Sequence, residues 1–308
     1  MNIPENLKQG DQIAIVAIGK KISFDEIKKS IETYESWGLK VQISKTIGAG
    51  ENYLAGSDKL KTTELQSYIN DPQIKAIIFA RGGYGAVRII DDINFSPLLE
   101  KNKWLIGFSD VTVVHNHVNT IFKLASVHGI MPVFFEKATA ASIESCKNVL
   151  FNGTMNYDFN AKNSTLIKEG TCEGEIVGGN LSIINSLCGS TSSLNTRDKI
   201  LFIEDLFEPL YHIDRMLQNL KRNGMFDELA GVIIGSFTDI DQGNPAFSKD
   251  IETIFNTYFS HLIIPIFSNF PSGHINDNRA LIFGQKVRYP HLNPRRLTWD
   301  RVARSSTK

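Results

Sequence analysis

The chain has 308 residues, 42% of them hydrophobic. Because domains usually contain about 100 to 200 residues, this length predicts two packed domains. Lysine plus arginine and aspartate plus glutamate each number 33, so the net charge is zero. A neutral chain has no overall field that would attract nucleic acid or an anionic membrane, and we expect neither as a partner.

Residues 1–21 lack the basic start, apolar core and cleavage site of a secretory signal. No apolar run approaches the roughly 18 residues of a membrane-spanning helix. The three cysteines are an odd number in a large chain, a count that does not suggest a disulfide framework. We therefore expect a soluble, cytoplasmic protein with reduced thiols.

The first half of the chain alternates short apolar runs with segments of helical period. The predicted strands are Gln12–Ile18, Lys40–Ser44, Ile74–Ala80 and Trp104–Phe108, and the predicted helices are Phe24–Trp37 and Asp58–Asn70, the second capped by Ser57. This alternation predicts βαβ units and a parallel sheet. Since such sheets bind ligands beyond the carboxyl ends of their strands, the loops after Ala80 and Phe108 are the expected site.

The pattern becomes polar and irregular from about Glu136 to Gly170, where we predict the connection between two domains. The second half again has apolar strands, predicted at Glu173–Gly179, Ile200–Ile203 and Gly231–Gly235. Between the last two, apolar residues recur at helical spacing and predict an amphipathic helix: Ile213, Met216, Leu217 and Leu220. Both halves are therefore expected to be α/β.

Ser109 follows the predicted strand Trp104–Phe108 and precedes a helix-period segment. A serine in such a turn is exposed at the sheet edge, and N–H groups at the start of the helix can stabilise an oxyanion. The glycine that usually follows the nucleophile by two positions is replaced by Val111. From these residues alone, Ser109 or Asp110 could instead cap the helix.

The glycine-rich segment Arg81–Gly85 follows the preceding strand, and we expect it to open a helix whose Val87, Ile90 and Ile93 face the sheet. Its glycines allow unusual backbone angles and a close approach of N–H groups to an anion. It lacks the spacing of a dinucleotide-binding motif and the lysine of a P-loop. A simple tight turn would also explain it.

Two carboxylates, Glu204 and Asp205, end an apolar strand, and either could orient an imidazole or cap the next helix. His274 lies beside Gly273 in a turn-rich loop, and an imidazole titrates near neutrality, as a general base requires.

The other candidate histidines are His115, His117 and His128. The first two point in different directions on a helix, so we expect them to pack or to face solvent. The spacing of the three does not predict a zinc site, and no metal is expected.

Taken together, these segments resemble the LD-carboxypeptidase family, which includes murein tetrapeptide carboxypeptidases and microcin C immunity proteins. The matching stretches keep a shared order along most of the chain: Tyr53–Asp58, Ala80–Gly85, Gly107–Asp110, His128–Gly129, Gly178–Leu181, Phe202–Asp205 with Asp214–Arg215, and Pro271–His274. The resemblance implies a serine peptidase with Ser109 as nucleophile, Glu204 as the triad acid and His274 as general base.

The resemblance further implies an oxyanion hole formed by the N–H of Asp110 and a glycine of the turn, Gly82 or Gly83. Arg81 is our candidate for binding the terminal carboxylate of the substrate, because guanidinium pairs with carboxylate in a bidentate manner. It could equally brace its own loop.

The resemblance implies a doubly wound N-terminal domain and a smaller C-terminal domain. With the connection placed by the polar pattern, we expect a flavodoxin-like domain at residues 1–140, a connection at 141–170 and an α/β domain at 171–308. A homodimer is also expected. The implied reaction is hydrolysis of the L,D-peptide bond to a terminal D-amino acid in murein tetrapeptides, in peptidoglycan recycling and without a cofactor. The alternatives are a microcin C-type peptidyl-nucleotide hydrolase that confers immunity, and a non-catalytic small-ligand-binding module.

Overall fold

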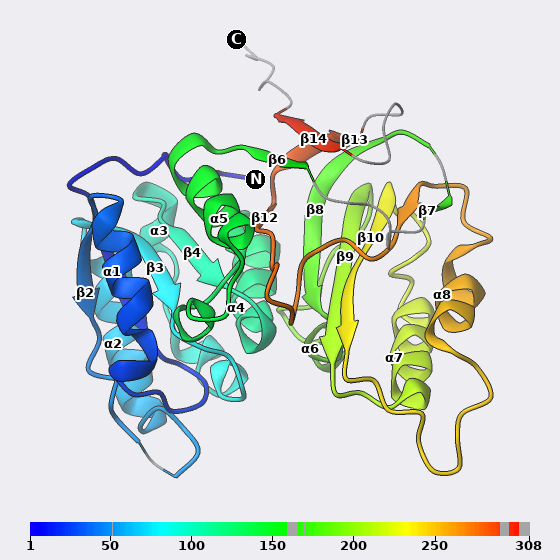
Figure 1. The fold of residues 1–308 in the computed structure, drawn as a ribbon, viewed down its shortest axis with the longest axis horizontal. Coiled ribbons are helices and arrows are strands. Elements are labelled where there is room, and N and C mark those ends of the chain that lie inside the picture. Colours follow the sequence, from blue (N-terminus) through cyan, green and yellow to red (C-terminus); the bar gives the residue numbers. More distant parts are fainter. Residues whose placement is uncertain (51, 159–165, 169, 290–295, 302–308) are drawn as a thin grey trace.

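Two β-sheets with flanking helices lie side by side in the computed structural model, which describes all residues except 51, 159–165, 169, 290–295 and 302–308 (Figure 1). The α-helices are α1 Lys28–Ser36, α2 Asp58–Asn70, α3 Pro97–Glu100, α4 Thr112–His117, α5 Ala140–Asn152, α6 Leu181–Ser186, α7 Leu210–Arg222 and α8 Ile251–Phe259. Among the described residues, no helix is long and apolar enough to cross a membrane.

The first sheet has the strand order β2-β1-β3-β4-β5-β12. Its strands are β1 Gln12–Val16, β2 Lys40–Ile43, β3 Ile74–Phe79, β4 Trp104–Gly107, β5 Ser126–His128 and β12 Leu281–Phe283. β1 to β5 are parallel, and their order 2-1-3-4-5 is that of a flavodoxin-like, doubly wound sheet. β12 pairs antiparallel with β5, so the second half of the chain also contributes to this sheet.

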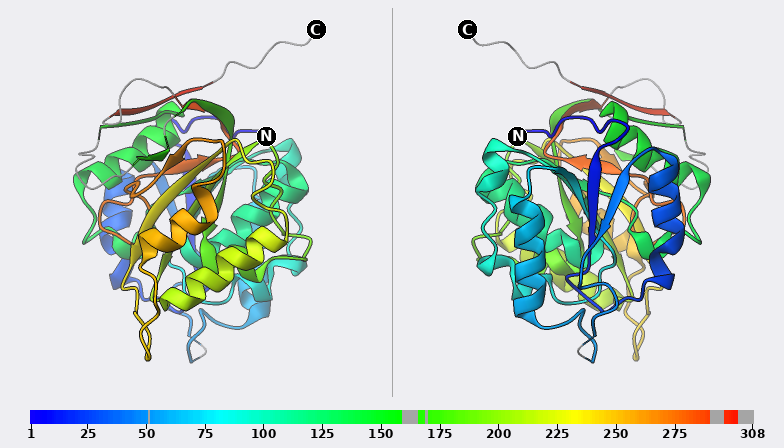
Figure 2. Two further views of the ribbon diagram at one scale, coloured as in Figure 1. Left: turned by 90° about the vertical axis from the view of Figure 1, so that its right-hand side faces the viewer. Right: turned by 90° about the vertical axis from the view of Figure 1, so that its left-hand side faces the viewer.

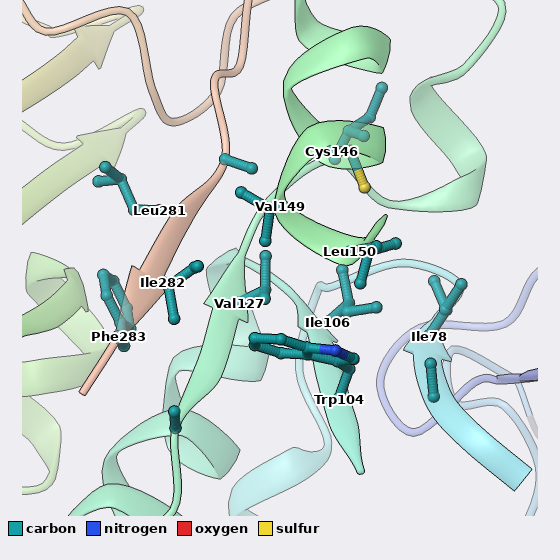
Figure 3. Packing of buried hydrophobic residues seen from close by; sticks show 14 of the residues in the cluster. Ile78, Trp104, Ile106, Val127, Cys146, Val149, Leu150, Leu281, Ile282 and Phe283 are labelled. Carbon is teal, nitrogen blue, oxygen red and sulfur yellow. The ribbon is translucent and has the colours of Figure 1, made fainter. Parts of the chain in front are cut away.

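Helices cover both faces of the first sheet. Alternate strand residues point to opposite faces, so Ile78 and Ile106 pack in one core with α1 and α5, while Ile77 and Leu105 pack in another with α2, α3 and α4. Figure 3 shows Val149 and Leu150 of α5 lying over the strands that carry Ile106 and Val127. This arrangement confirms the predicted doubly wound architecture.

Helix α5 corrects one prediction. The stretch after Glu136 was expected to be irregular, yet residues 140–152 form this helix, with a cap in which the Thr139 side chain accepts a hydrogen bond from the backbone N–H of Ser142. Cys146, Val149 and Leu150 are spaced by three and four positions, so they form one buried stripe. The polar residues between them concealed this stripe. Residues 159–165 and 169 of the predicted connection lie outside the described residues.

The segment after Arg81–Gly85 also differs from its prediction. In place of an α-helix it forms two short 3-10 turns, at Ala86–Arg88 and Ile90–Asp92. Ile90 is buried as expected, but Val87 is exposed. Several β-branched residues follow one another here, and their restricted side chains lower helix propensity.

The second sheet has the order β6-β14-β13-β8-β9-β10-β11-β7. Its strands are β6 Met155–Asp158, β7 Leu166–Lys168, β8 Cys172–Asn180, β9 Lys199–Leu206, β10 Gly231–Thr238, β11 Ile266–Phe267, β13 Lys286–Tyr289 and β14 Arg296–Arg301. β8 to β11 are parallel, and the strands outside them pair antiparallel. The predicted amphipathic helix is confirmed as α7, which buries all four predicted residues.

Helices α6, α7 and α8 pack on one face of the second sheet (Figure 2). On the opposite face, Ile176, Ile200 and Phe202 join the same core as β12 and the first sheet. A single core therefore extends across both sheets, and it holds their carboxyl-end loops in a fixed relation.

Candidate active site

Ser109 lies immediately beyond β4, in a turn that leads into a 3-10 segment, Ser109–Val111, and then into α4. Its φ angle is 62°, a left-handed conformation that is unfavourable for a residue other than glycine. Backbone strain of this kind concentrates at functional sites, and a nucleophile in a sharp strand-to-helix turn is one example. The side chain is half-buried, so it remains accessible.

The alternative that Ser109 or Asp110 caps the helix is not observed. Neither the 3-10 segment nor α4 has a side-chain cap at its start. Instead, Oδ2 of the buried Asp110 carboxylate accepts a hydrogen bond from the backbone N–H of Ala86 at 3.0 Å. The residue after the serine thus fastens the glycine-rich turn to the start of the helix.

The glycine-rich turn approaches Ser109 through Gly82. A Cβ atom added to Gly82 would lie 2.9 Å from the Ser109 Cβ, 3.0 Å from its Oγ and 3.3 Å from the backbone N of Asp110. Gly83 has a φ of 108°, which favours glycine. The absence of side chains therefore brings the backbone of this turn next to the hydroxyl and to the N–H of Asp110.

His274 and Glu204 form a hydrogen-bonded pair from the second sheet. Glu204 is fully buried near the end of β9, and its Oε2 lies 2.7 Å from Nδ1 of His274. Gly273 makes this contact possible, because a Cβ there would be 2.4 Å from Ser236 Oγ and 2.8 Å from Glu204 Oε2. A carboxylate can only accept, so Nδ1 carries the proton and Nε2 is the free basic nitrogen of the neutral ring.

The aromatic ring of Phe108 connects this pair to the serine. The imidazole of His274 packs against it at 4.8 Å between centroids and an interplanar angle of 62°. Since Phe108 directly precedes Ser109, the contact brings the histidine of the second half to the serine turn of the first. Sequence reasoning gave Phe108 no role, since an apolar residue at a strand end usually packs in the core.

A second contact between the halves lies behind the serine. The backbone N–H of Asn180 donates to Thr112 Oγ1 at 3.0 Å, and a Cβ on Gly179 would lie 2.5 Å from the same oxygen. The Gly178–Leu181 motif therefore provides close packing of β8 on α4.

Burial and neighbouring charges shift the pKa of His274 in opposite directions. Burial alone would lower its pKa, but the charge of Glu204, the hydrogen bond to it and the charge of Asp205 together raise the pKa above its usual value of 6.5. Asp205 points elsewhere: its carboxylate accepts from the Asn180 side chain and from the backbone of Ser182 and Leu206. Burial and then the charge of Glu204 raise the pKa of Asp205 to about 7.

Arg81 lies at the start of the glycine-rich turn, where its Nη1 is 3.3 Å from both the Lys21 carbonyl and Glu26 Oε1. These contacts match the loop-bracing alternative. Its side chain is 23% exposed, and a guanidinium carries several N–H donors, so donors other than Nη1 can bind a carboxylate ligand.

The other histidines pack in the interior. His115 Nε2 lies 2.9 Å from the Gly107 carbonyl, and His117 Nδ1 lies 2.9 Å from Ser192 Oγ. His128 is fully buried between the rings of Phe202 and Phe283. In the part of the chain that the structure describes, no three His, Cys, Asp or Glu side chains are grouped as a metal site would require.

Comparison with known proteins identifies the relatives of this chain. Residues 13–129 match the family model of the LD-carboxypeptidase N-terminal domain, and residues 173–289 match that of the C-terminal domain. A probable murein peptide carboxypeptidase of Bacillus subtilis is 30% identical over 287 residues, covering 92% of this chain and 90% of the relative.

Two further matches cover nearly the whole length. The murein tetrapeptide carboxypeptidase of Pseudomonas aeruginosa is 27% identical over 304 residues, covering 94% of this chain and 95% of the relative. A solved structure of MccF in complex with glutamyl sulfamoyl guanosine has a TM-score of 0.87 at 20% identity, covering 97% of this chain and 99% of that one. The latter similarity is one of fold.

Proposed function

This chain belongs to the LD-carboxypeptidase family, and we propose that it is a serine carboxypeptidase that hydrolyses the L,D-peptide bond to a terminal D-amino acid in murein tetrapeptides. The carboxypeptidase relatives support this substrate class. The observation that carries the proposed mechanism is the His274–Glu204 pair packed against Phe108, the residue that directly precedes the strained Ser109.

In the proposed reaction, His274 Nε2 removes the proton of the Ser109 hydroxyl as Oγ attacks the scissile carbonyl carbon. The C–N bond then breaks, the same proton passes to the departing amine, and an acyl-serine ester remains. Water, deprotonated by His274, hydrolyses this ester and regenerates the hydroxyl. Glu204 holds the imidazole in the required tautomer and stabilises its charged form.

The oxyanion that forms in each step needs backbone donors. We assign this role to the N–H of Asp110 and to the turn at Gly82 and Gly83, because Gly82 lies against both the hydroxyl and that N–H. Arg81 is assigned to the terminal carboxylate of the substrate. We also propose a cytoplasmic location, where imported wall fragments are recycled, and a homodimer.

The experiment that tests this function combines active-site labelling with product analysis. A fluorophosphonate should label Ser109 in the parent protein, and His274→Ala should abolish labelling because the hydroxyl then lacks its base. Mass spectrometry of a murein tetrapeptide after incubation should show loss of one D-alanine.

A panel that also contains acyl-sulfamoyl nucleotides tests the second candidate, which the fold shared with MccF favours. Faster cleavage of the nucleotides would replace the murein assignment with the immunity type of activity. Tight binding of any panel member without labelling or cleavage would indicate a binding module.

The raised pKa of His274 predicts the pH dependence. Only the neutral imidazole can accept the serine proton, so kcat/KM should rise with pH through the pKa of His274, with a midpoint above 6.5. Steady-state kinetics across the neutral range measure this midpoint. Asp205 titrates in the same region, so Asp205→Asn is the control and should retain the rising limb. A midpoint at or below 6.5 in both proteins would contradict the assignment of His274.

A further inference from the structure

A buried cation lies beneath the glycine-rich turn. Lys61, on α2, has a fully buried side chain whose Nζ is 2.9 Å from Asp58 Oδ1. A Cβ on Gly85 would lie 3.3 Å from the same Nζ, so the ammonium touches the turn itself. Among the described residues, no side chain or carbonyl accepts a well-aligned hydrogen bond from it. Burying an ammonium is costly, and a buried ion pair is weak evidence for a purely stabilising role.

Asp58 only partly offsets this cation, because it also binds Arg88. Nε of Arg88 lies 3.2 and 3.0 Å from the two carboxylate oxygens, and Nη2 lies 2.6 Å from Oδ2. One carboxylate is thus shared by two cations, and the trio of Lys61, Asp58 and Arg88 keeps a net charge of +1. Arg88 is exposed to solvent, so the positive charge of this trio that lies inside the protein and is only partly compensated is that of Lys61.

The carboxylate of Asp110 contacts the same glycine-rich turn as Lys61, one residue further along, at Ala86. It is buried, it accepts from the backbone of Ala86 at 3.0 Å, and a Cβ on Gly19 would lie 3.0 Å from its Oδ2. Burial raises its pKa, whereas the hydrogen bonds from Ala86 and Gly85 and the charge of Lys61 act to lower it.

This carboxylate presents a problem for the proposed reaction. The N–H of Asp110 would bind a developing oxyanion, while the side chain of the same residue carries a negative charge in a water-poor environment. Like charges repel strongly there, so an uncompensated carboxylate would oppose the transition state.

We propose that Lys61 is a positioning residue that neutralises the Asp110 carboxylate beneath the oxyanion hole, so that negative charge can develop on the carbonyl beside Ser109. The inference rests on the proposed serine mechanism. It assigns a function to a lysine that sequence analysis passed over, since a single lysine on a helix is usually exposed.

The test measures Lys61→Met in the parent and in an Asp110→Asn background. The readouts are kcat and KM for D-alanine release and, independently of the natural substrate, the rate of Ser109 phosphonylation by a fluorophosphonate. Phosphonylation also develops negative charge on an oxygen beside the serine. In the parent, Lys61→Met should lower kcat and the phosphonylation rate by about 10- to 100-fold, less than the 10²- to 10³-fold typical of losing a direct oxyanion donor. KM should stay within about threefold, since the lysine does not touch substrate.

In the Asp110→Asn background, Lys61→Met should lower kcat and the phosphonylation rate by less than about threefold, because no carboxylate charge then needs compensation. Lys61→Arg, which keeps the charge, should restore most of the rate. If Lys61→Met does not fold, Lys61→Gln takes its place.

Equal losses in the two backgrounds, or failure of Lys61→Arg to restore the rate in a folded protein, would overturn the proposal and leave a structural role. An unchanged rate in Lys61→Met would overturn it as well, while the serine mechanism stands if Ser109 is still labelled. If no peptide is cleaved while Lys61→Met still slows labelling of Ser109 in the parent but not in the Asp110→Asn background, the substrate assignment fails and this inference holds.

Discussion

Ser109→Ala is expected to reduce kcat for D-alanine release by about 10⁶-fold, the size of effect seen when the serine or histidine of a triad is removed. The reason is covalent: without the hydroxyl no acyl-enzyme can form, and the His274–Glu204 pair has no proton to accept. The measurement is single-turnover release of D-alanine from a murein tetrapeptide. The fold should persist, because the Ser109 side chain caps neither the 3-10 segment nor α4.

Two further variants make this expectation specific. Ser109→Gly should be equally inactive but more stable than Ser109→Ala by about 1 kcal/mol, because glycine relieves the left-handed strain at a φ of 62°. Ser236→Ala removes a nearby hydroxyl that donates to the Ser272 carbonyl, and it should keep activity within about tenfold. Activity retained in Ser109→Ala but lost in Ser236→Ala would identify a different nucleophile.

Much of the fold could be predicted from hydrophobic pattern, because the parallel strands are buried on both faces and appear as continuous apolar runs. The strand predicted at Ile74–Ala80 is observed at Ile74–Phe79, and the helix Asp58–Asn70 with its Ser57 cap is observed as predicted. The pattern failed where polar residues interrupt the apolar stripe of a helix, as in α5, or where β-branched residues disfavour a helix, as after Gly85. It also could not place β12 in the first sheet, because that pairing joins positions more than 150 residues apart in sequence.

The site was harder to predict from the sequence than the fold. The local residues left Ser109 as either a nucleophile or a helix cap. Its left-handed backbone conformation, which is typical of a nucleophile in a sharp turn, cannot be predicted from residue types. Residue types alone did not separate Glu204 from Asp205, and it was the family resemblance that implied Glu204 as the triad acid. The structure gives the physical difference: Glu204 meets an imidazole, and Asp205 meets backbone N–H groups. Lys61 gave no signal at all, since its burial results from the return of the glycine-rich turn over α2.

This separation of the two acids leads to the second large expected effect. Glu204→Gln should lower kcat by about 10⁴-fold, as does amide replacement of the orienting acid in other triads. A glutamine amide can donate to Nδ1 of His274, which would place the ring proton on Nε2 and leave no base facing the serine.

Asp205→Asn is the matched control, because it changes a neighbouring buried acid that contacts Asn180 and Ser182. We expect its kcat to fall by less than about tenfold, while its stability falls by about 1 to 3 kcal/mol. Tetrapeptide kinetics and thermal unfolding of both variants distinguish the roles. A Glu204→Gln protein that keeps more than a tenth of the parental kcat, beside an inactive but folded Asp205→Asn, would move the orienting role to Asp205.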